Sequence, residues 1–141
     1  MIPSRYLSPL SKKDKRIQQK MILKSRRLYK KGIYATRKAL PSYPTKESSH
    51  VIRAKQKFGV DSMVPSKELA KKTGCPLHVL QKIVQKGEGA YYSSGSRPNQ
   101  TPQSWGLARL ASALTGGPAA KVDASLVKQC SNISDGGNRS Y

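Results

Sequence analysis

Acidic residues, aromatic residues and long hydrophobic runs are all scarce in this chain. Only 7 of the 141 residues are aspartate or glutamate, against 27 lysines and arginines, so the formal net charge at pH 7 is +20. No apolar run approaches the roughly 20 residues that a membrane-spanning helix needs, so we expect no transmembrane segment. A chain with this charge balance is typical of proteins that bind a negatively charged partner.

Residues suited to catalysis or metal binding are few and scattered. The two cysteines, Cys75 and Cys130, are too few for a disulfide scaffold. Cys75 and His78 could supply half of a zinc site, but zinc sites normally show two paired motifs. No nucleophile stands beside a positioned base, and no Gly-Lys-Ser/Thr motif indicates a P-loop. We therefore expect no enzymatic activity, no cofactor, no metal and no small-molecule substrate.

Capping residues and apolar spacing predict an all-α protein, a small bundle of short helices with a basic N-terminal helical arm and extended termini. Ser11 and Asp14 can cap a first helix that Gly32 ends. Helical spacing places four residues on one face of this helix: Ile17, Met21, Lys24 and Leu28. Ile22 and Leu23 lie beside that face. Gly and Pro residues separate the other expected helices, at about 48–58, 67–73, 76–86, 102–114 and 119–130.

These elements suggest three parts. We expect a basic arm and helix over residues 1–47, a compact helical domain over 48–130 and a polar tail over 131–141. Residues 87–101 are rich in Gly and Ser and are predicted to form a loop, in which 90–92 could make a short strand.

The first helix is the main candidate for contact with a partner. Residues 12–38 hold 12 lysines and arginines and one acid. Like charges four residues apart destabilise an isolated helix by a few tenths of a kcal/mol per pair, so nucleic acid, an acidic protein face or anionic lipid should neutralise them. A solvated face is the alternative. The expected contact residues are Lys12, Lys13, Arg16, Lys20, Lys24, Arg26, Arg27, Lys30 and Lys31.

Residues 66–86 fit the pattern of a helix-turn-helix unit. Ala70 allows close helix approach, Gly74 suits the turn, and Leu80 and Ile83 can bury the second helix against the first. A DNA-reading unit would present four residues to the major groove: His78, Gln81, Lys82 and Gln85. Plain helix packing without groove reading is the more common role of such a pair.

The loop motif that follows offers a second candidate contact. Adjacent Tyr91 and Tyr92 could stack on bases, and Arg97 could hold a phosphate near the next helix. Alternatively, one tyrosine packs against Trp105 and Arg97 caps a neighbouring backbone. The residues singled out in and after this loop are Tyr91, Tyr92, Arg97, Asn99, Trp105 and Arg109.

Three stretches resemble an uncharacterised family of small basic proteins from large double-stranded DNA viruses of algae and amoebae. They are KKGIY (30–34), SKELAKKTGC (66–75) and KGEGAYYSSGSRPNQTPQSWGLARLAS (86–112). The resemblance implies a viral origin but carries no assigned activity.

The first hypothesis is a non-enzymatic minor capsid protein that binds and cements neighbouring major and minor capsid proteins, located in the virion and, during assembly, in the host cell. The alternative is a DNA-binding protein that uses residues 66–86 and is packaged with the genome. Contact with an anionic membrane surface is a further partner consistent with the charge.

Overall fold

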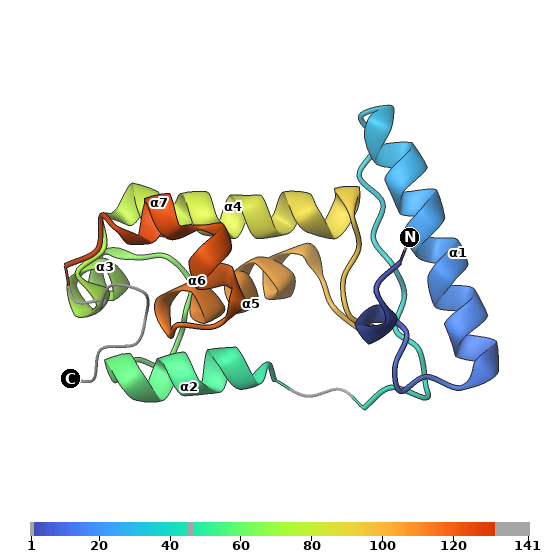
Figure 1. Ribbon diagram of the computed structural model, residues 1–141, viewed down its shortest axis with the longest axis horizontal. Coiled ribbons are helices and arrows are strands. Elements are labelled where there is room, and N and C mark those ends of the chain that lie inside the picture. The colour runs from blue at the N-terminus through green and yellow to red at the C-terminus, as the bar shows by residue number, and fades with distance from the viewer. Residues whose placement is uncertain (1, 45–46, 132–141) are drawn as a thin grey trace. The chain divides into compact units, whose positions relative to one another are not determined.

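The computed structural model describes residues 2–44 and 47–131, and regular structure in this part of the chain is entirely helical (Figure 1). This confirms the predicted all-α class. None of the described helices is long and apolar enough to cross a membrane. The elements are η1 (Ser4–Tyr6, a 3-10 turn), α1 (Lys12–Lys30), α2 (Ser49–Phe58), α3 (Lys67–Thr73), α4 (Leu77–Ser93), α5 (Pro102–Leu114), α6 (Pro118–Val122) and α7 (Ala124–Val127).

The first three helices begin and end where the caps predict. The hydroxyl of Ser11 accepts a hydrogen bond from the backbone N–H of Asp14, which satisfies a donor that the first turn of α1 would otherwise leave free. Ser66 caps α3 in the same way. Gly74 ends α3 with φ at 71°, a left-handed conformation that glycine adopts without strain.

The chain divides into two compact units that alternate along the sequence. Unit 1 comprises residues 1–46 and 88–105, and unit 2 comprises 47–87 and 106–141. The expected division into 1–47 and 48–130 has its boundary at nearly the same place, but residues 88–105 group with the N-terminal segment. Apart from Ser131, the expected tail lies outside the described residues.

Helix α4 extends beyond its predicted end at residue 86. Gly87 lies inside the helix and is buried, where a Cβ atom would stand 2.6 Å from the Cα of Gly106 in α5. Glycine is therefore needed for the close approach of the two helices. The prediction of a loop over 87–101 is wrong for residues 87–93, and the candidate strand at 90–92 is helical.

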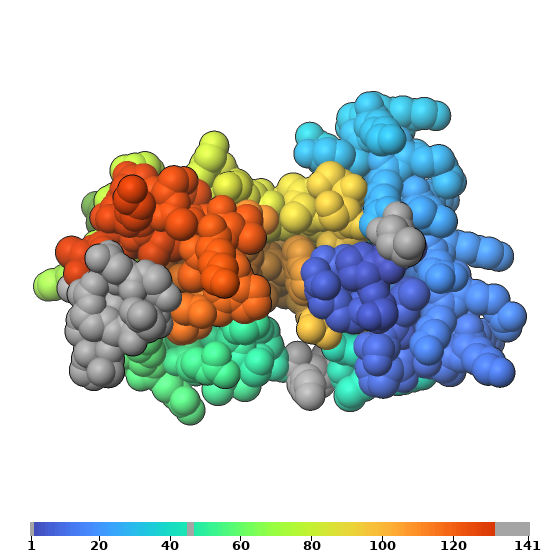
Figure 2. Space-filling view, viewed as in Figure 1, coloured from blue at the N-terminus to red at the C-terminus, as the bar shows by residue number. Residues whose placement is uncertain are grey.

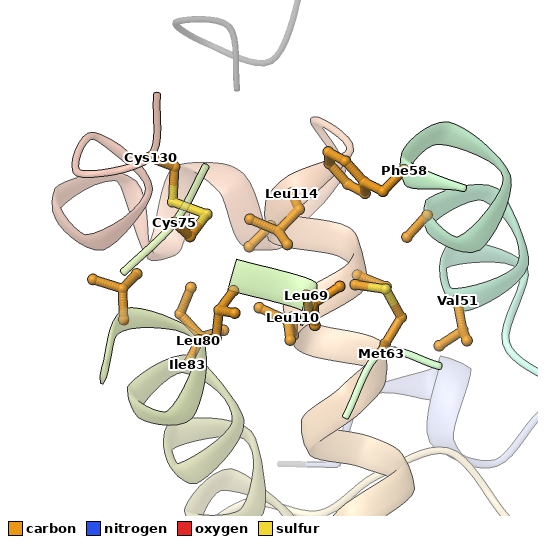
Figure 3. Close-up of a cluster of buried hydrophobic side chains, with 14 residues drawn as sticks. Val51, Phe58, Met63, Leu69, Cys75, Leu80, Ile83, Leu110, Leu114 and Cys130 are labelled. Atoms are coloured by element: carbon orange, nitrogen blue, oxygen red, sulfur yellow. A yellow bond between two sulfur atoms is a disulfide. The ribbon is translucent and has the colours of Figure 1, made fainter. Parts of the chain in front are cut away.

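Unit 2 is built around an apolar core (Figure 3). Leu80 and Ile83 of α4 are fully buried, as predicted, and belong to the same apolar cluster as Leu69 of α3. The buried set is Val51, Ala54, Phe58, Met63, Leu69, Cys75, Val79, Leu80, Ile83, Leu110, Ala111, Ala113, Leu114 and Cys130.

A disulfide joins Cys75, which follows α3, to Cys130, which follows α7 (Figure 3). The spacing of the two residues does not indicate this bond, and the sequence analysis missed it. Beside it, the backbone N–H of Ser131 donates to the carbonyl of Gly74 at 2.8 Å. Since both sulfur atoms are in the disulfide, neither is a free thiolate that could bind a metal together with His78.

The predicted last helix, 119–130, is instead two short helices, α6 and α7, that meet at Asp123. The side chain of Asp123 is fully buried and accepts two hydrogen bonds of 2.8 Å from Arg109, while the ammonium of Lys86 lies 3.0 Å away. Burial raises the pKa of Asp123, but the hydrogen bonds and charges of Arg109 and Lys86 outweigh it and hold the pKa below its usual range.

Candidate nucleic-acid interface

Polar side chains make up most of the buried face of α1. Asp14, Gln18, Ile22 and Ser25 are buried, at positions i, i+4, i+8 and i+11. The predicted apolar face is wrong, because Lys24 is exposed and Ile17, Met21 and Leu28 are only partly buried. Of the two residues expected beside it, Ile22 is fully buried and Leu23 is exposed. Hydrogen bonding therefore determines which face of α1 packs within unit 1 more than hydrophobicity does.

Each of these polar side chains has partners from distant parts of unit 1. Asp14 accepts hydrogen bonds from the backbone N–H and the hydroxyl of Ser42, at 3.0 and 2.6 Å, which lowers the pKa of this carboxyl. The amide of Gln18 donates to the carbonyls of Tyr6 and Ser96, both at 3.3 Å. A buried polar group costs little once it is bonded in this way.

Arg37 links the elements of unit 1 and was not singled out in the sequence. Its guanidinium donates to the hydroxyls of Ser25 and Ser96 and to the carbonyl of Tyr91, at 3.0 to 3.1 Å. It also lies 3.8 Å from the centroid of the Tyr91 ring, a cation–π contact. Burial lowers the pKa of Arg37, against the effect of the neighbouring Tyr91. No sequence motif marks a lone arginine in a connector as such a centre.

The loop motif is used largely inside the protein. Tyr91 is fully buried, so its ring is not open to a base. Asn99 adopts a left-handed conformation with φ at 61°. Its amide bonds the backbone N–H and carbonyl of Leu40 and the carbonyl of Tyr43. Asn99 thereby fixes the connector that follows α1.

Three further residues of that motif also contact other parts of the chain. Arg97 is exposed and donates to the carbonyl of Arg5 at 3.5 Å, in line with the backbone-capping alternative. Trp105 meets the ring of Tyr6 edge-on at 5.9 Å, a tyrosine other than the two expected. Arg109 belongs to unit 2, where it binds Asp123.

The opposite face of α1 carries the cations. Four exposed residues repeat the spacing of the buried face two residues further on, which places them on the other side of a helix of 3.6 residues per turn: Arg16, Lys20, Lys24 and Arg27. Lys12, Lys13, Lys30 and Lys31 are also exposed. Arg26 is partly buried and donates to the carbonyl of Ser94 at 2.8 Å. Long side chains of α1 project from the surface in Figure 2.

Little negative charge balances this face. Asp14 is the only acid of α1, and it is turned inward. Within the described part of the chain, ion pairs join Lys55 to Glu47 and both Lys86 and Arg109 to Asp123, and none involves an exposed cation of α1. The face therefore presents a row of charges along a helix about 28 Å long.

Three tyrosine rings gather near the C-terminal end of α1. The rings of Tyr34 and Tyr92 stack at 5.1 Å with 30° between their planes, and Tyr29 and Tyr92 stack at 6.1 Å and 3°. We call these three residues the tyrosine cluster. Tyr34 is 67% exposed, and the pKa of Tyr92 is raised by its partial burial and its neighbours.

Unit 2 has the two helices and the glycine turn that the helix-turn-helix pattern predicts. α3 and α4 flank the turn at Gly74, and the four proposed groove-facing residues are exposed: His78, Gln81, Lys82 and Gln85. Their spacing places them along one side of α4. Groove reading by this side stays a prediction.

Among the residues that the structure describes, no group of three or more His, Cys, Asp or Glu side chains is arranged to hold an ion.

Comparison with known proteins places most of the chain in a described family. The family of unknown function DUF5824 matches residues 3–128, most of both units. No curated protein and no solved structure matches the chain. The match carries no activity over to this chain.

Proposed function

The chain belongs to the DUF5824 family, whose function is unknown, and from its own surface we propose a non-enzymatic protein that binds nucleic acid through the exposed face of α1. The observation that carries this proposal is the row of Arg16, Lys20, Lys24 and Arg27 opposite the buried face, with the acid of α1 turned inward. A phosphate backbone supplies the closely spaced negative charge that such a row lacks.

The proposal predicts a measurable dependence on salt. If four cations each neutralise one phosphate, the logarithm of the binding constant falls with a slope of about −3.6 against the logarithm of salt concentration. Affinity then drops roughly 150-fold between about 50 and 200 mM salt. A weak, non-electrostatic contact would show almost no such change.

A charge-matched pair of variants tests the face. One variant changes four residues of α1: Arg16→Gln, Lys20→Gln, Lys24→Gln and Arg27→Gln. The control changes four exposed lysines of unit 2: Lys67→Gln, Lys71→Gln, Lys121→Gln and Lys128→Gln. Anisotropy of labelled duplex DNA should show the salt slope lost in the first variant and largely kept in the control. An equal loss of the salt slope in both variants would show that binding depends only on net charge, and would contradict the proposal.

A structural role in a virus particle is the second candidate. Its supporting observation is the apolar surface beside the cations: Leu23, Ile33 and Tyr34 are 45, 50 and 67% exposed. A mixed basic and apolar surface suits an acidic protein neighbour such as a capsid protein, and the resemblance to viral proteins favours this setting. Regularly arranged copies in emptied particles would support it, and recovery with the released genome alone would contradict it.

The helix pair of unit 2 offers a different way to bind DNA. Gln81 and Lys82 lie exposed on α4, where they could read bases in the major groove. Changing both to Ala should then alter the preference between DNA sequences. Unchanged sequence preference in that variant would leave α3 and α4 with a packing role.

A further inference from the structure

The tyrosine cluster includes a ring that lies at the surface rather than in the core. Tyr34 stacks on Tyr92, yet 67% of it remains exposed. It follows α1 directly, after the turn at Gly32, and Ile33 beside it is half exposed. We propose that the exposed ring of Tyr34 is a stacking platform for a base of single-stranded nucleic acid. This inference rests on the proposed function and adds the class of ligand.

The platform is held in place from below. Tyr92 meets the ring of Tyr91 edge-on at 5.2 Å, and Arg37 lies against the Tyr91 ring. The carbonyl of Tyr92 accepts a hydrogen bond from the hydroxyl of Ser25 in α1 at 3.3 Å. Tyr34 therefore stacks on a supported ring, so that little ordering is needed when a base binds.

The charges near the cluster suit a phosphate chain. Arg27 and Lys30 lie in the last turn of α1, and Lys31 follows it; all three are exposed. Glu88 is an acidic neighbour of Tyr92, and the three cations outnumber it. Alternating ring faces and cations are the combination by which proteins bind single strands without sequence preference.

An unpaired base fits this surface better than a duplex does. In a duplex the base faces are covered by neighbouring base pairs, so an exposed ring has nothing to stack on, whereas a single strand can turn its bases outward. The row of cations on α1 can bind the phosphates of either form. A preference for single strands over duplex therefore distinguishes stacking on Tyr34 from phosphate binding by the cations.

The test compares three variants of the full chain by anisotropy with a labelled oligothymidylate and a labelled duplex of equal length. Tyr34→Leu keeps an apolar side chain but removes the ring, Tyr34→Phe keeps the ring, and Ile33→Ala is the matched control on the same exposed segment. Because Tyr34 is largely exposed, we expect all three to fold, which circular dichroism verifies.

We expect Tyr34→Leu to bind the oligothymidylate about 5- to 100-fold more weakly, with duplex binding unchanged. Tyr34→Phe and Ile33→Ala should bind as the wild type does. Oligothymidylate binding that is unaffected by Tyr34→Leu overturns the platform, and so does an equal loss for duplex and single strand. In either case salt-dependent duplex binding by the wild type would leave the proposed function standing, whereas a wild type that binds neither form overturns both proposals.

Discussion

The close approach of α4 to α5 makes Gly87 a sharp test of the structure. In Gly87→Ala, the new Cβ atom would lie 2.6 Å from the Cα of Gly106 and 3.3 Å from its nitrogen. Because these atoms are backbone, no flexible side chain can move aside, and one helix must shift. Gly89, two residues on in the same helix, is the matched control, since its nearest neighbour would be the hydroxyl of Tyr29 at 4.0 Å.

Opposing effects set the size of the change. Alanine in a helix interior is favoured over glycine by up to about 1 kcal/mol, which both variants gain. Forcing extra volume into a packed contact costs about 1–3 kcal/mol, which only Gly87→Ala incurs. We therefore expect Gly87→Ala to be about 1–3 kcal/mol less stable than Gly89→Ala, and Gly89→Ala to be at least as stable as the wild type.

Urea unfolding of the oxidised protein, followed by helical circular dichroism, measures both free energies. Equal stability of the two variants would show that α4 and α5 do not approach closely at Gly87. A loss in both variants would instead mean that this part of α4 is not helical.

Three further predictions concern the interiors of the two units. Reduction, or the double change of Cys75 and Cys130 to Ser, should lower the free energy of unfolding by up to about 4 kcal/mol for a separation of 55 residues; identical melting with and without reductant would contradict the bond. Asp123→Asn should cost about 1.5–3 kcal/mol, because it weakens the hydrogen bonds that Arg109 donates to a buried charged group. The pKa of Asp123 in the folded state lies below its unfolded value of about 3.9, so its contribution to the free energy of unfolding is full above that value and is lost as pH falls through the folded pKa. The variant should therefore lose less stability in acid than the wild type. Parallel curves of stability against pH would contradict this. Gln18→Leu should lower the free energy of unfolding by about 1–3 kcal/mol and speed hydrogen exchange in α1, because it leaves the carbonyls of Tyr6 and Ser96 without this donor. Gln19→Leu, on the exposed side of the helix, should have neither effect. Equal effects of the two changes would contradict the assigned buried face.

Local signals predicted the helices well, because caps act over a few residues. Ser11, Ser66 and Gly74 mark helix ends through hydrogen bonds and backbone conformations within one turn. Gly87 misled the prediction because a glycine that ends a helix and one that permits close packing look alike in sequence. The partner that distinguishes them, Gly106, is in another helix.

The choice of face on α1 could not come from periodicity. Ile17, Met21 and Leu28 offered an apolar stripe, but Asp14 and Gln18 find partners in segments distant in sequence. Pairing of this kind depends on tertiary structure, as does the disulfide. The cations of α1 could nevertheless be singled out from the sequence, because the number of lysines and arginines does not depend on which face of the helix is buried. The stacking of Tyr34 on Tyr92 had no local signal in the sequence.

The two units differ in what holds them together, and this bears on binding. Unit 2 has a continuous apolar core and a disulfide. By contrast, α1 is held in unit 1 largely by hydrogen bonds that Asp14 and Ser25 accept and Gln18 donates. Repulsion along the exposed face of α1 opposes that docking. On the proposed function, a polyanion that neutralises the row and binds only the folded form would remove this repulsion. It would stabilise unit 1 by an amount that grows with the logarithm of the ratio of its concentration to its dissociation constant. The helix that is held largely by hydrogen bonds is thus the one whose docking such a ligand would reinforce.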